Sequence, residues 1–239
     1  MSQLVLVRHG QAAFMTDNYD RLTELGIEQA RMLGRYWAQR QVRFDALISG
    51  SLERQRATAE IAATEMRNAG LPVPEVEILP EFNEYDGDGI VRHFLPQLKE
   101  KDPELRQLDS AYAAAEDSRA KRRAFQKLFE AVTEKWISGD MLSPEVESFA
   151  SFHARVSRGV EKLTSGAGSG KRIGVFSSGG AISVAVQLAV QAPQDKVLEF
   201  NWRIRNCSLS EVVFSGRRFS LDIFNSVPHL SDESMHTYR

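Results

Sequence analysis

The sequence predicts an α/β fold with a mainly parallel sheet, and two observations carry that prediction. Short apolar runs alternate with helical patterns along most of the chain. Three of these runs lead through a glycine-containing turn to a helical pattern, and they begin at residues 4, 44 and 172. Alternating strands and helices are typical of parallel sheets. Because we find no internal repeat, low-complexity segment or convincing linker, the 239 residues favour one domain.

Composition indicates a globular protein and gives no sign of a nucleic-acid or membrane partner. The chain is 42% hydrophobic and 26% charged, with a formal net charge of −2. No stretch approaches the roughly 20 apolar residues that span a bilayer, and the N-terminus lacks signal-peptide features. Cys207 is the single cysteine, which excludes an internal disulfide and favours a reducing compartment. We therefore expect a cytoplasmic protein with a buried, inert Cys207.

The first predicted strand, Leu4–Val7, leads directly into Arg8-His9-Gly10. In open α/β sheets, ligands bind beyond the carboxyl ends of the strands, so these residues face a predicted crevice. A guanidinium group binds phosphate, and a neutral imidazole can attack phosphorus or an acyl carbon. Glycine permits the close approach of a ligand or of another backbone. An ordinary strand end, with a surface arginine and a capping histidine, explains the tripeptide alone equally well.

The next elements place a second arginine beside another strand end. Thr23 is the expected N-cap of the first helix. A strand over residues 44–48 then turns into a helix over about residues 52–68. Arg54 therefore lies in a first helical turn, close to the carboxyl end of a strand, as Arg8 does. This repetition weakens the interpretation of both arginines as ordinary surface charges.

An acidic, turn-rich loop over residues 80–89 follows a third extended segment at residues 76–79. Acid clusters in loops are usually only solvated. A divalent-metal site formed by Glu84, Asp86 and Asp88 is conceivable, although the sequence lacks the frame of a calcium loop. A general acid from this loop is the sharper hypothesis.

Residues 91–138 are charged and rich in helical patterns, and we expect Pro96 and Pro103 to divide them into separate helices. Apolar side chains between Phe125 and Trp136 recur at helical spacing, which predicts a packed stripe. Because residues 90–142 stand between the candidate site segments, they could form a lid over a substrate.

We expect the remaining elements to be a helix, a strand, a second helix and a hairpin, over about residues 143–165, 172–176, 181–190 and 209–224. The glycine-rich segment 165–171 precedes its strand and lacks the residues of a phosphate loop, so we interpret it as a connector. The turn Ser177–Gly180 would present backbone N–H groups to an anion, with tight helix packing as the alternative. Residues beyond Leu230 are expected to be loosely held.

These motifs, in this order, resemble the histidine phosphatase superfamily, which has the phosphoglycerate mutase-like fold. The resemblance spans nearly the whole chain and rests on Arg8-His9-Gly10, on Leu22-Thr23 with Gly26 and Gln29-Ala30, on Leu52-x-Arg54 with Thr58-Ala59, on Pro80-x-Phe82-x-Glu84, and on Phe224-Asn225 with His229-Leu230. It implies a three-layer α/β/α fold with a mainly parallel central sheet. It also implies a single domain over residues 1–239, with residues 90–142 as a helical insertion or lid.

The resemblance also implies roles for individual residues. His9 would be the nucleophile that forms a phosphohistidine, and Arg8 and Arg54 would hold the phosphoryl oxygens. Glu84 would protonate the departing alkoxide and then activate water, with Glu81 as the rival proton donor. No metal and no cofactor are implied, because the guanidinium groups would neutralise the phosphoryl charge.

The sequence departs from the family pattern where the family usually has a second histidine that contacts the phosphoryl group. Here the position is Ser178, which would be a substrate-binding residue and can donate one hydrogen bond but carries no charge. Losing one such donor could cost on the order of 10²–10³ in rate. Gly50 and Gln55 also stand where serine and alanine are usual.

The leading expectation is a metal-independent phosphomonoester hydrolase that acts on a small phosphorylated substrate through a phosphohistidine. A mutase of the phosphoglycerate type ranks lower, because the insertion shows little resemblance to the longer signatures of the glycolytic mutases. A phosphate-binding pseudoenzyme is the third possibility, and Ser178 is its only support. The sequence names neither the substrate nor the oligomeric state, and we expect specificity to lie in residues 85–142.

Overall fold

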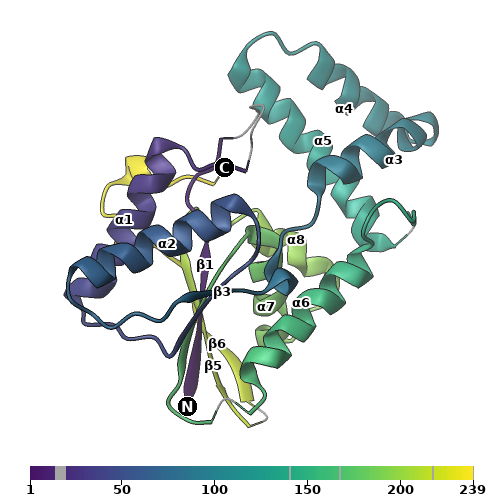
Figure 1. Cartoon of the computed structure of the whole chain (residues 1–239). Helices are drawn as coiled ribbons and strands as arrows, with labels where there is room; N and C mark the ends of the chain where they lie inside the picture. The colour runs from purple at the N-terminus through teal and green to yellow at the C-terminus, as the bar shows by residue number, and fades with distance from the viewer. Residues whose placement is uncertain (14–19, 140, 167, 217, 239) are drawn as a thin grey trace. The chain divides into compact units, whose positions relative to one another are not determined.

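The computed structural model describes residues 1–13, 20–139, 141–166, 168–216 and 218–238. It divides into two compact units, the first formed by Met1–Glu84 with Arg155–Arg239 and the second by Tyr85–Ala154 (Figure 1). The predicted insertion, residues 90–142, falls within the second unit, and its role as a lid stays a prediction. Across the described residues, no helix is both long and apolar enough to cross a bilayer.

The first unit is built on a six-stranded sheet with the order β3-β2-β4-β1-β5-β6. Its strands are β1 (Ser2–Arg8), β2 (Ala46–Ser49), β3 (Val76–Ile78), β4 (Arg172–Ser177), β5 (Leu209–Ser215) and β6 (Arg218–Ser226). Strands β1 to β4 pair in parallel, whereas β5 and β6 add an antiparallel edge. The predicted mainly parallel sheet and the predicted hairpin are therefore confirmed.

Helices cover both faces of this sheet. They are α1 (Glu24–Gln39) and α2 (Glu53–Asn68) on one face and α7 (Gly179–Val190) and α8 (Val197–Asn201) on the other (Figure 1). Under α1 and α2, the apolar core gathers Val5, Val7, Leu33, Trp37 and Phe176. Burial of these side chains supplies the main favourable free energy for docking the helices. The predicted three-layer architecture is confirmed.

The strand register fixes which loops lie together. Arg8 pairs with Ser177 across β1 and β4, and Ser49 pairs with Phe176 across β2 and β4. The N–H of His9 donates to the carbonyl of Ser177 at 2.8 Å. Because these three strands are parallel neighbours, their carboxyl ends meet at one edge of the sheet. The turns that follow them are thereby adjacent.

The second unit is helical, with α3 (Gly87–Lys101), α4 (Pro103–Ala113), α5 (Ser118–Ser138) and the part of α6 (Phe149–Thr164) that runs up to Ala154. The predicted stripe on α5 is buried at Leu128, Val132 and Trp136. Pro96 lies inside α3 and does not end it, so that predicted break is wrong. Packing of Ile90 and Phe94, both buried on α3, outweighs the cost of one lost backbone hydrogen bond.

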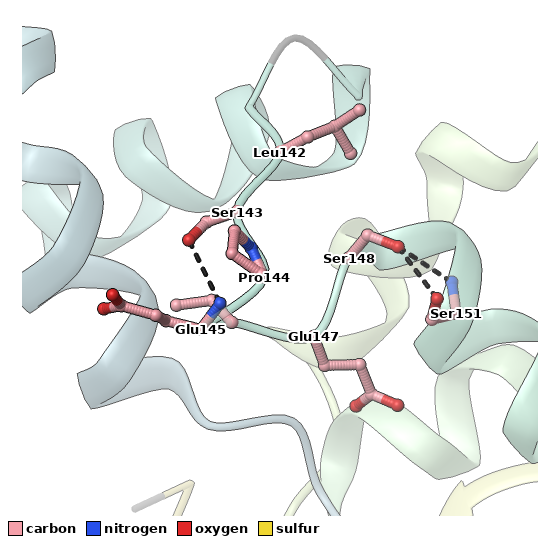
Figure 2. Close-up of a pocket in the computed structure, with 8 residues that line it drawn as sticks. Leu142, Ser143, Pro144, Glu145, Glu147, Ser148 and Ser151 are labelled. Atoms are coloured by element: carbon pink, nitrogen blue, oxygen red, sulfur yellow. Dashed lines mark hydrogen bonds between the residues drawn. The ribbon is translucent and has the colours of Figure 1, made fainter.

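The start of α6 also differs from the prediction, because the helix begins at Phe149 and not near Ser143. Ser148 forms the N-terminal cap, since its Oγ accepts from the N–H of Ser151 at 3.2 Å. Upstream, Ser143 and Val146 pair in an isolated antiparallel bridge. This irregular segment and the capping turn line a pocket of about 540 Å³ within the second unit (Figure 2).

Candidate active site

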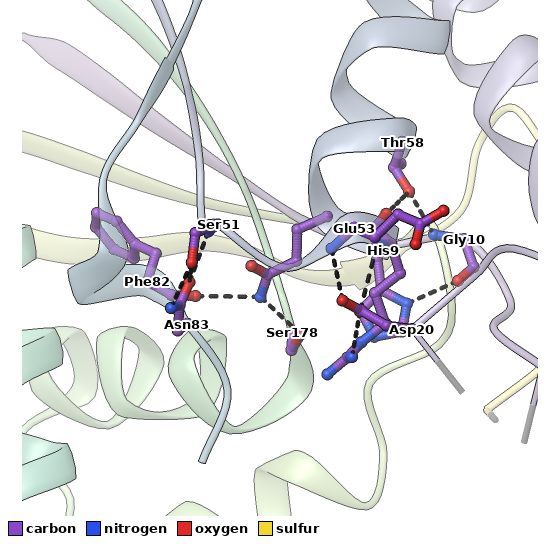
Figure 3. A network of polar contacts seen from close by, with 11 residues as sticks. His9, Gly10, Asp20, Ser51, Glu53, Thr58, Phe82, Asn83 and Ser178 are labelled. Atoms are coloured by element: carbon purple, nitrogen blue, oxygen red, sulfur yellow. Dashed lines mark hydrogen bonds and ion pairs between the residues drawn. The ribbon is translucent and has the colours of Figure 1, made fainter. Parts of the chain in front are cut away.

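His9 follows β1 and is held on both ring nitrogens. Its side chain is buried, with Arg54 Nε donating to His9 Nε2 at 3.2 Å and Nδ1 lying 2.7 Å from the Gly10 carbonyl oxygen (Figure 3). Because a guanidinium N–H can only donate, Nε2 must be the acceptor and Nδ1 must carry the proton. The lone pair of Nε2 is therefore directed toward Arg54.

The surroundings of His9 keep the imidazole neutral. Burial lowers its pKa well below 6.5, and the positive charges of Arg54 and then Arg8 lower the pKa further. The Gly10 carbonyl opposes this shift but is outweighed. A neutral imidazole with a defined acceptor nitrogen is the form that can act as a nucleophile.

Arg54 stands in the first turn of α2, as predicted, and is oriented from two sides. Its Nη1 donates to Asp20 Oδ1 at 2.7 Å, opposite to the contact that its Nε makes with His9. Asp20 also accepts from the N–H of Glu53 at 2.8 Å, and thereby caps α2 from outside the helix. Sequence analysis did not identify Asp20, because a cap supplied 33 residues away leaves no local signal.

Arg8 is buried at the end of β1, and its Nη1 donates to the carbonyl of Ile204. The backbone that follows is fixed by Cys207, whose N–H donates to the Arg8 carbonyl at 3.0 Å. Cys207 itself is fully buried, and burial raises the pKa of its thiol, as expected for an inert cysteine. Arg54 therefore contacts the imidazole of His9 directly, whereas Arg8 acts on it through its charge, which helps to lower the His9 pKa.

Gly10 is required by a close backbone approach. A Cβ at this position would lie 2.4 Å from the carbonyl oxygen of Gly26 on α1, which is closer than any side chain allows. The Gly10 N–H donates to Thr58 Oγ1 at 3.0 Å, and that hydroxyl donates to the Arg54 carbonyl at 2.7 Å. Thr58 therefore ties the His9 turn to the helix that carries Arg54.

The two candidate proton donors point in different directions. Glu84 Oε2 accepts from the N–H of Gly180 at 3.0 Å, so its carboxylate lies at the turn between β4 and α7. Glu81 instead faces Lys162 of α6 at 4.0 Å. Nη1 of Arg155 fixes the loop that carries both acids, since it donates to three of that loop's backbone carbonyls. Of the two, Glu84 is the one directed toward the carboxyl ends of the strands.

The metal-site alternative gains no support from the loop geometry. Asp86 caps α3 and accepts from the N–H of Gly89 at 2.8 Å, whereas Glu84 binds the backbone of α7. Among the described residues, no group of three or more histidine, cysteine, aspartate or glutamate side chains is arranged to hold a metal ion.

Ser178 lies at the N-cap of α7, where a serine would usually cap the helix, yet its side chain makes no capping hydrogen bond. Its hydroxyl instead accepts from Gln55 Nε2 at 2.8 Å. Gln55 is fully buried and follows Arg54 on α2. The sequence predicts Ser178 as a substrate-binding residue, whereas Gln55 stands out only as a departure from the family pattern. Their contact joins segments far apart in the chain and leaves no local signal.

The C-terminal segment is tied to the turn that follows His9, so the prediction that residues beyond Leu230 are loosely held is wrong for the described residues up to Tyr238. Gln29 of α1 donates to the Met235 carbonyl at 2.8 Å, and the Thr237 carbonyl accepts from the N–H of Asn206 at 2.8 Å. Asn206 Nδ2 in turn donates to the His9 carbonyl at 3.2 Å. Backbone and buried amide hydrogen bonds, which composition does not reveal, hold this polar tail in place.

The chain matches the family model of the histidine phosphatase superfamily, branch 1, over residues 4–116 and 97–227. It is also 34% identical over 93 residues to a 2,3-bisphosphoglycerate-dependent phosphoglycerate mutase of Methylorubrum populi, covering 36% of this chain. The chain spans only 44% of the length of that relative.

Solved structures share the fold at low sequence identity. Bacillus stearothermophilus YhfR has a TM-score of 0.67 at 17% identity, covering 97% of this chain and 100% of the other. The alpha-ribazole phosphatase of Shigella flexneri has a TM-score of 0.62 at 24% identity, over 94% of this chain and 96% of the other. A phosphoserine phosphatase mutant of Entamoeba histolytica, in complex with phosphoserine, has a TM-score of 0.63 at 20% identity, over 96% and 100%. The family match, which covers most of the chain, establishes that this chain belongs to the histidine phosphatase superfamily.

Proposed function

We propose that the protein is a phosphomonoester hydrolase that acts through a phosphohistidine on His9 and needs no metal ion. The observation that carries the proposal is the imidazole itself: it is buried, its pKa is lowered by burial and by the charges of Arg54 and Arg8, and its Nε2 accepts from Arg54 while Nδ1 faces the Gly10 carbonyl. Those cations suit the transferring phosphoryl group, whose charge grows on its outer oxygens.

In the first step, the lone pair of His9 Nε2 forms a bond to phosphorus while the ester P–O bond breaks. Arg54 Nε, which donates to Nε2 in the free protein, transfers its hydrogen bond to a phosphoryl oxygen and releases the lone pair. The protonated carboxyl of Glu84 gives its proton to the departing alkoxide, so no free alkoxide forms.

In the second step, the Glu84 carboxylate removes a proton from water, and the resulting nucleophile attacks phosphorus. The P–N bond breaks and returns the electron pair to His9 Nε2, with inorganic phosphate as the second product. The placement of Glu84 at the N-terminus of α7 supports its role at both steps, since Glu81 faces α6.

A mutase is the second candidate, favoured by the name of the curated relative that shares 34% identity over 93 residues. Both activities use the same first step and differ in whether water or a second hydroxyl accepts the phosphoryl group. A phosphate-binding pseudoenzyme, supported only by Ser178, is the third. We assign substrate choice to the second unit, because its chain begins directly after Glu84.

One experiment separates these candidates. The purified protein is incubated with a generic aryl phosphate, with and without a chelator, beside the variant His9→Ala. Chelator-resistant hydrolysis that disappears in His9→Ala supports the hydrolase. Phosphoglycerate interconversion faster than hydrolysis would favour the mutase, and vanadate binding without turnover would favour the pseudoenzyme.

A further inference from the structure

Gln55 is a buried polar residue that the proposed mechanism leaves without a role. Its Nε2 donates to the Phe82 carbonyl at 3.2 Å and to Ser178 Oγ at 2.8 Å, which uses both amide hydrogens. Its Oε1 is buried and has no hydrogen-bond partner among the described residues. A buried acceptor without a partner costs stability, so the arrangement of this amide calls for an explanation beyond folding.

Gly50, in the turn after β2, provides the space for this amide. A Cβ at Gly50 would lie 2.0 Å from Gln55 Oε1 and 2.9 Å from Asn83 Oδ1. The Asn83 oxygen is itself fixed by the N–H of Ser51 at 2.6 Å, so it has little freedom to move. Space, and not a left-handed backbone, therefore excludes a side chain at Gly50.

The contact with Gln55 determines how the Ser178 hydroxyl is used. The hydroxyl accepts from Gln55, and it does not cap α7, where Glu84 accepts from the Gly180 N–H in its place. A hydroxyl that accepts one hydrogen bond in a fixed direction still has its single proton to donate. Ser178 follows Ser177, whose carbonyl accepts from the N–H of His9, so that proton is available at the strand edge that carries His9.

We propose that Gln55 is a positioning residue that directs the Ser178 hydroxyl toward a phosphoryl oxygen, and that Gly50 makes room for it. The inference rests on the proposed function and deepens it. Gly50, Gln55 and Ser178 would together provide a neutral hydrogen-bond donor that does not titrate. Its contribution to phosphoryl binding would therefore not change with pH.

Stability and activity should respond oppositely to the isosteric variant Gln55→Met. The Phe82 carbonyl keeps its bond from Ser177 Oγ at 2.6 Å, and the unpartnered Oε1 disappears. We therefore expect an unchanged or higher Tm, together with a roughly ten- to hundredfold loss in kcat/KM toward an aryl phosphate. Gln187→Met, at a buried glutamine that donates to the Ala192 carbonyl, is the matched control and should lower Tm without changing kcat/KM.

Two further variants test the direction of the hydrogen bond. Gln55→Glu keeps the shape but loses the donor, so it should be impaired at neutral pH and should recover toward acid pH, where a protonated carboxyl can donate to Ser178. Ser178→Ala should lose about as much activity as Gln55→Met, and the double variant should lose no more, because both act through one contact. Additive losses, or a Gln55→Glu variant that follows the wild-type pH profile, would overturn the proposal.

The role of Gly50 is tested by a cycle with Gln55→Ala. Gly50→Ala alone should displace the carboxamide and lower kcat/KM, whereas in the Gln55→Ala background it should cost little more. An equal cost of Gly50→Ala in both backgrounds would contradict a role for Gly50 in seating Gln55.

Equilibrium binding of vanadate keeps this inference separate from the proposed function. Wild type that binds vanadate but hydrolyses nothing would defeat the hydrolase proposal, and a roughly tenfold or greater loss of vanadate affinity in Gln55→Met would still support the positioning role. Unchanged vanadate affinity and unchanged kcat/KM in Gln55→Met would defeat the inference, even if the wild type proved to be an active phosphatase.

Discussion

Two consecutive residues of α2 serve two different halves of the candidate site. Arg54 contacts His9 and, with Arg8, forms the cationic half, where two permanent charges act on one buried imidazole. Gln55 faces Ser178 and forms the neutral half, which contains only an amide and a hydroxyl. The comparison suggests a division of labour, in which one half supplies charge for the phosphoryl group and the other supplies only orientation.

Substitution of the proposed proton donor should have the largest effect on activity. The effect should depend on where the carboxylate points, because Glu84 and Glu81 are the same residue type but face different elements. Glu84→Gln is expected to lower kcat by roughly 10²–10⁴, because a carboxamide neither donates an acidic proton nor activates water. Glu81→Gln is the matched control, since it alters only a 4.0 Å ion pair with Lys162. Steady-state kinetics with an aryl phosphate would measure both, and equal losses would remove the distinction drawn between the two acids.

Arg54→Met should follow, with a loss of about 10²–10³ in kcat/KM, because it removes a charged donor from the phosphoryl group. The pKa of the His9 imidazole should also rise, since the Arg54 charge helps to lower it. NMR titration of the His9 ring would measure that pKa. A loss no larger than that of Ser178→Ala would erase the difference between the two halves.

The fold could be predicted from the sequence because its strands, helices and caps are each marked by local, recurring patterns. The first strand, the Thr23 cap and the Arg8-His9-Gly10 motif each show themselves within a few residues. The errors at Pro96 and at the start of α6 arose where packing or a later serine cap outweighed the nearest helix signal. A sequence pattern shows each helix signal separately, whereas the position of a helix end in the folded chain depends on all caps and packing contacts together.

The site could be predicted only in part, because some of its contacts join residues that are far apart in the sequence. The cationic half rests on residue types whose chemistry is evident in isolation. The neutral half rests on a contact between Gln55 and Ser178, which are 123 residues apart. Arg54 and Asp20 are 34 residues apart, so their ion pair also leaves no local motif in the sequence. Only the sheet register and the placement of α2 bring these partners together.

The variant Ser178→His tests the neutral half of the site, and its expected effect on kcat/KM is smaller than those of the Glu84 and Arg54 variants. The Gln55 carboxamide occupies the position next to residue 178, so a histidine introduced alone should not raise kcat/KM. Paired with Gln55→Ala, which frees that space, the same substitution should outperform Ser178→His alone by roughly tenfold. Rate enhancement by Ser178→His alone would indicate that Ser178 is merely a lost ligand.

The smallest effect concerns stability. The folded protein holds the pKa of His9 well below 6.5, whereas the unfolded chain leaves it near 6.5. Between those values the unfolded state binds the extra proton, so the free energy of unfolding should fall as the pH drops below about 6.5. Urea unfolding across this range should show a shallower fall for His9→Asn than for the wild type. Parallel curves would mean that His9 is not held neutral by the fold.

Trapping the covalent intermediate tests the central claim most directly. The protein would be mixed rapidly with an aryl phosphate, quenched in alkali and digested, and the site of phosphorylation would be located by mass spectrometry. The account predicts an acid-labile phosphoryl group on His9 alone, formed as fast as the first product is released and absent from His9→Ala. Phosphate on another residue, or steady hydrolysis by His9→Ala, would contradict it.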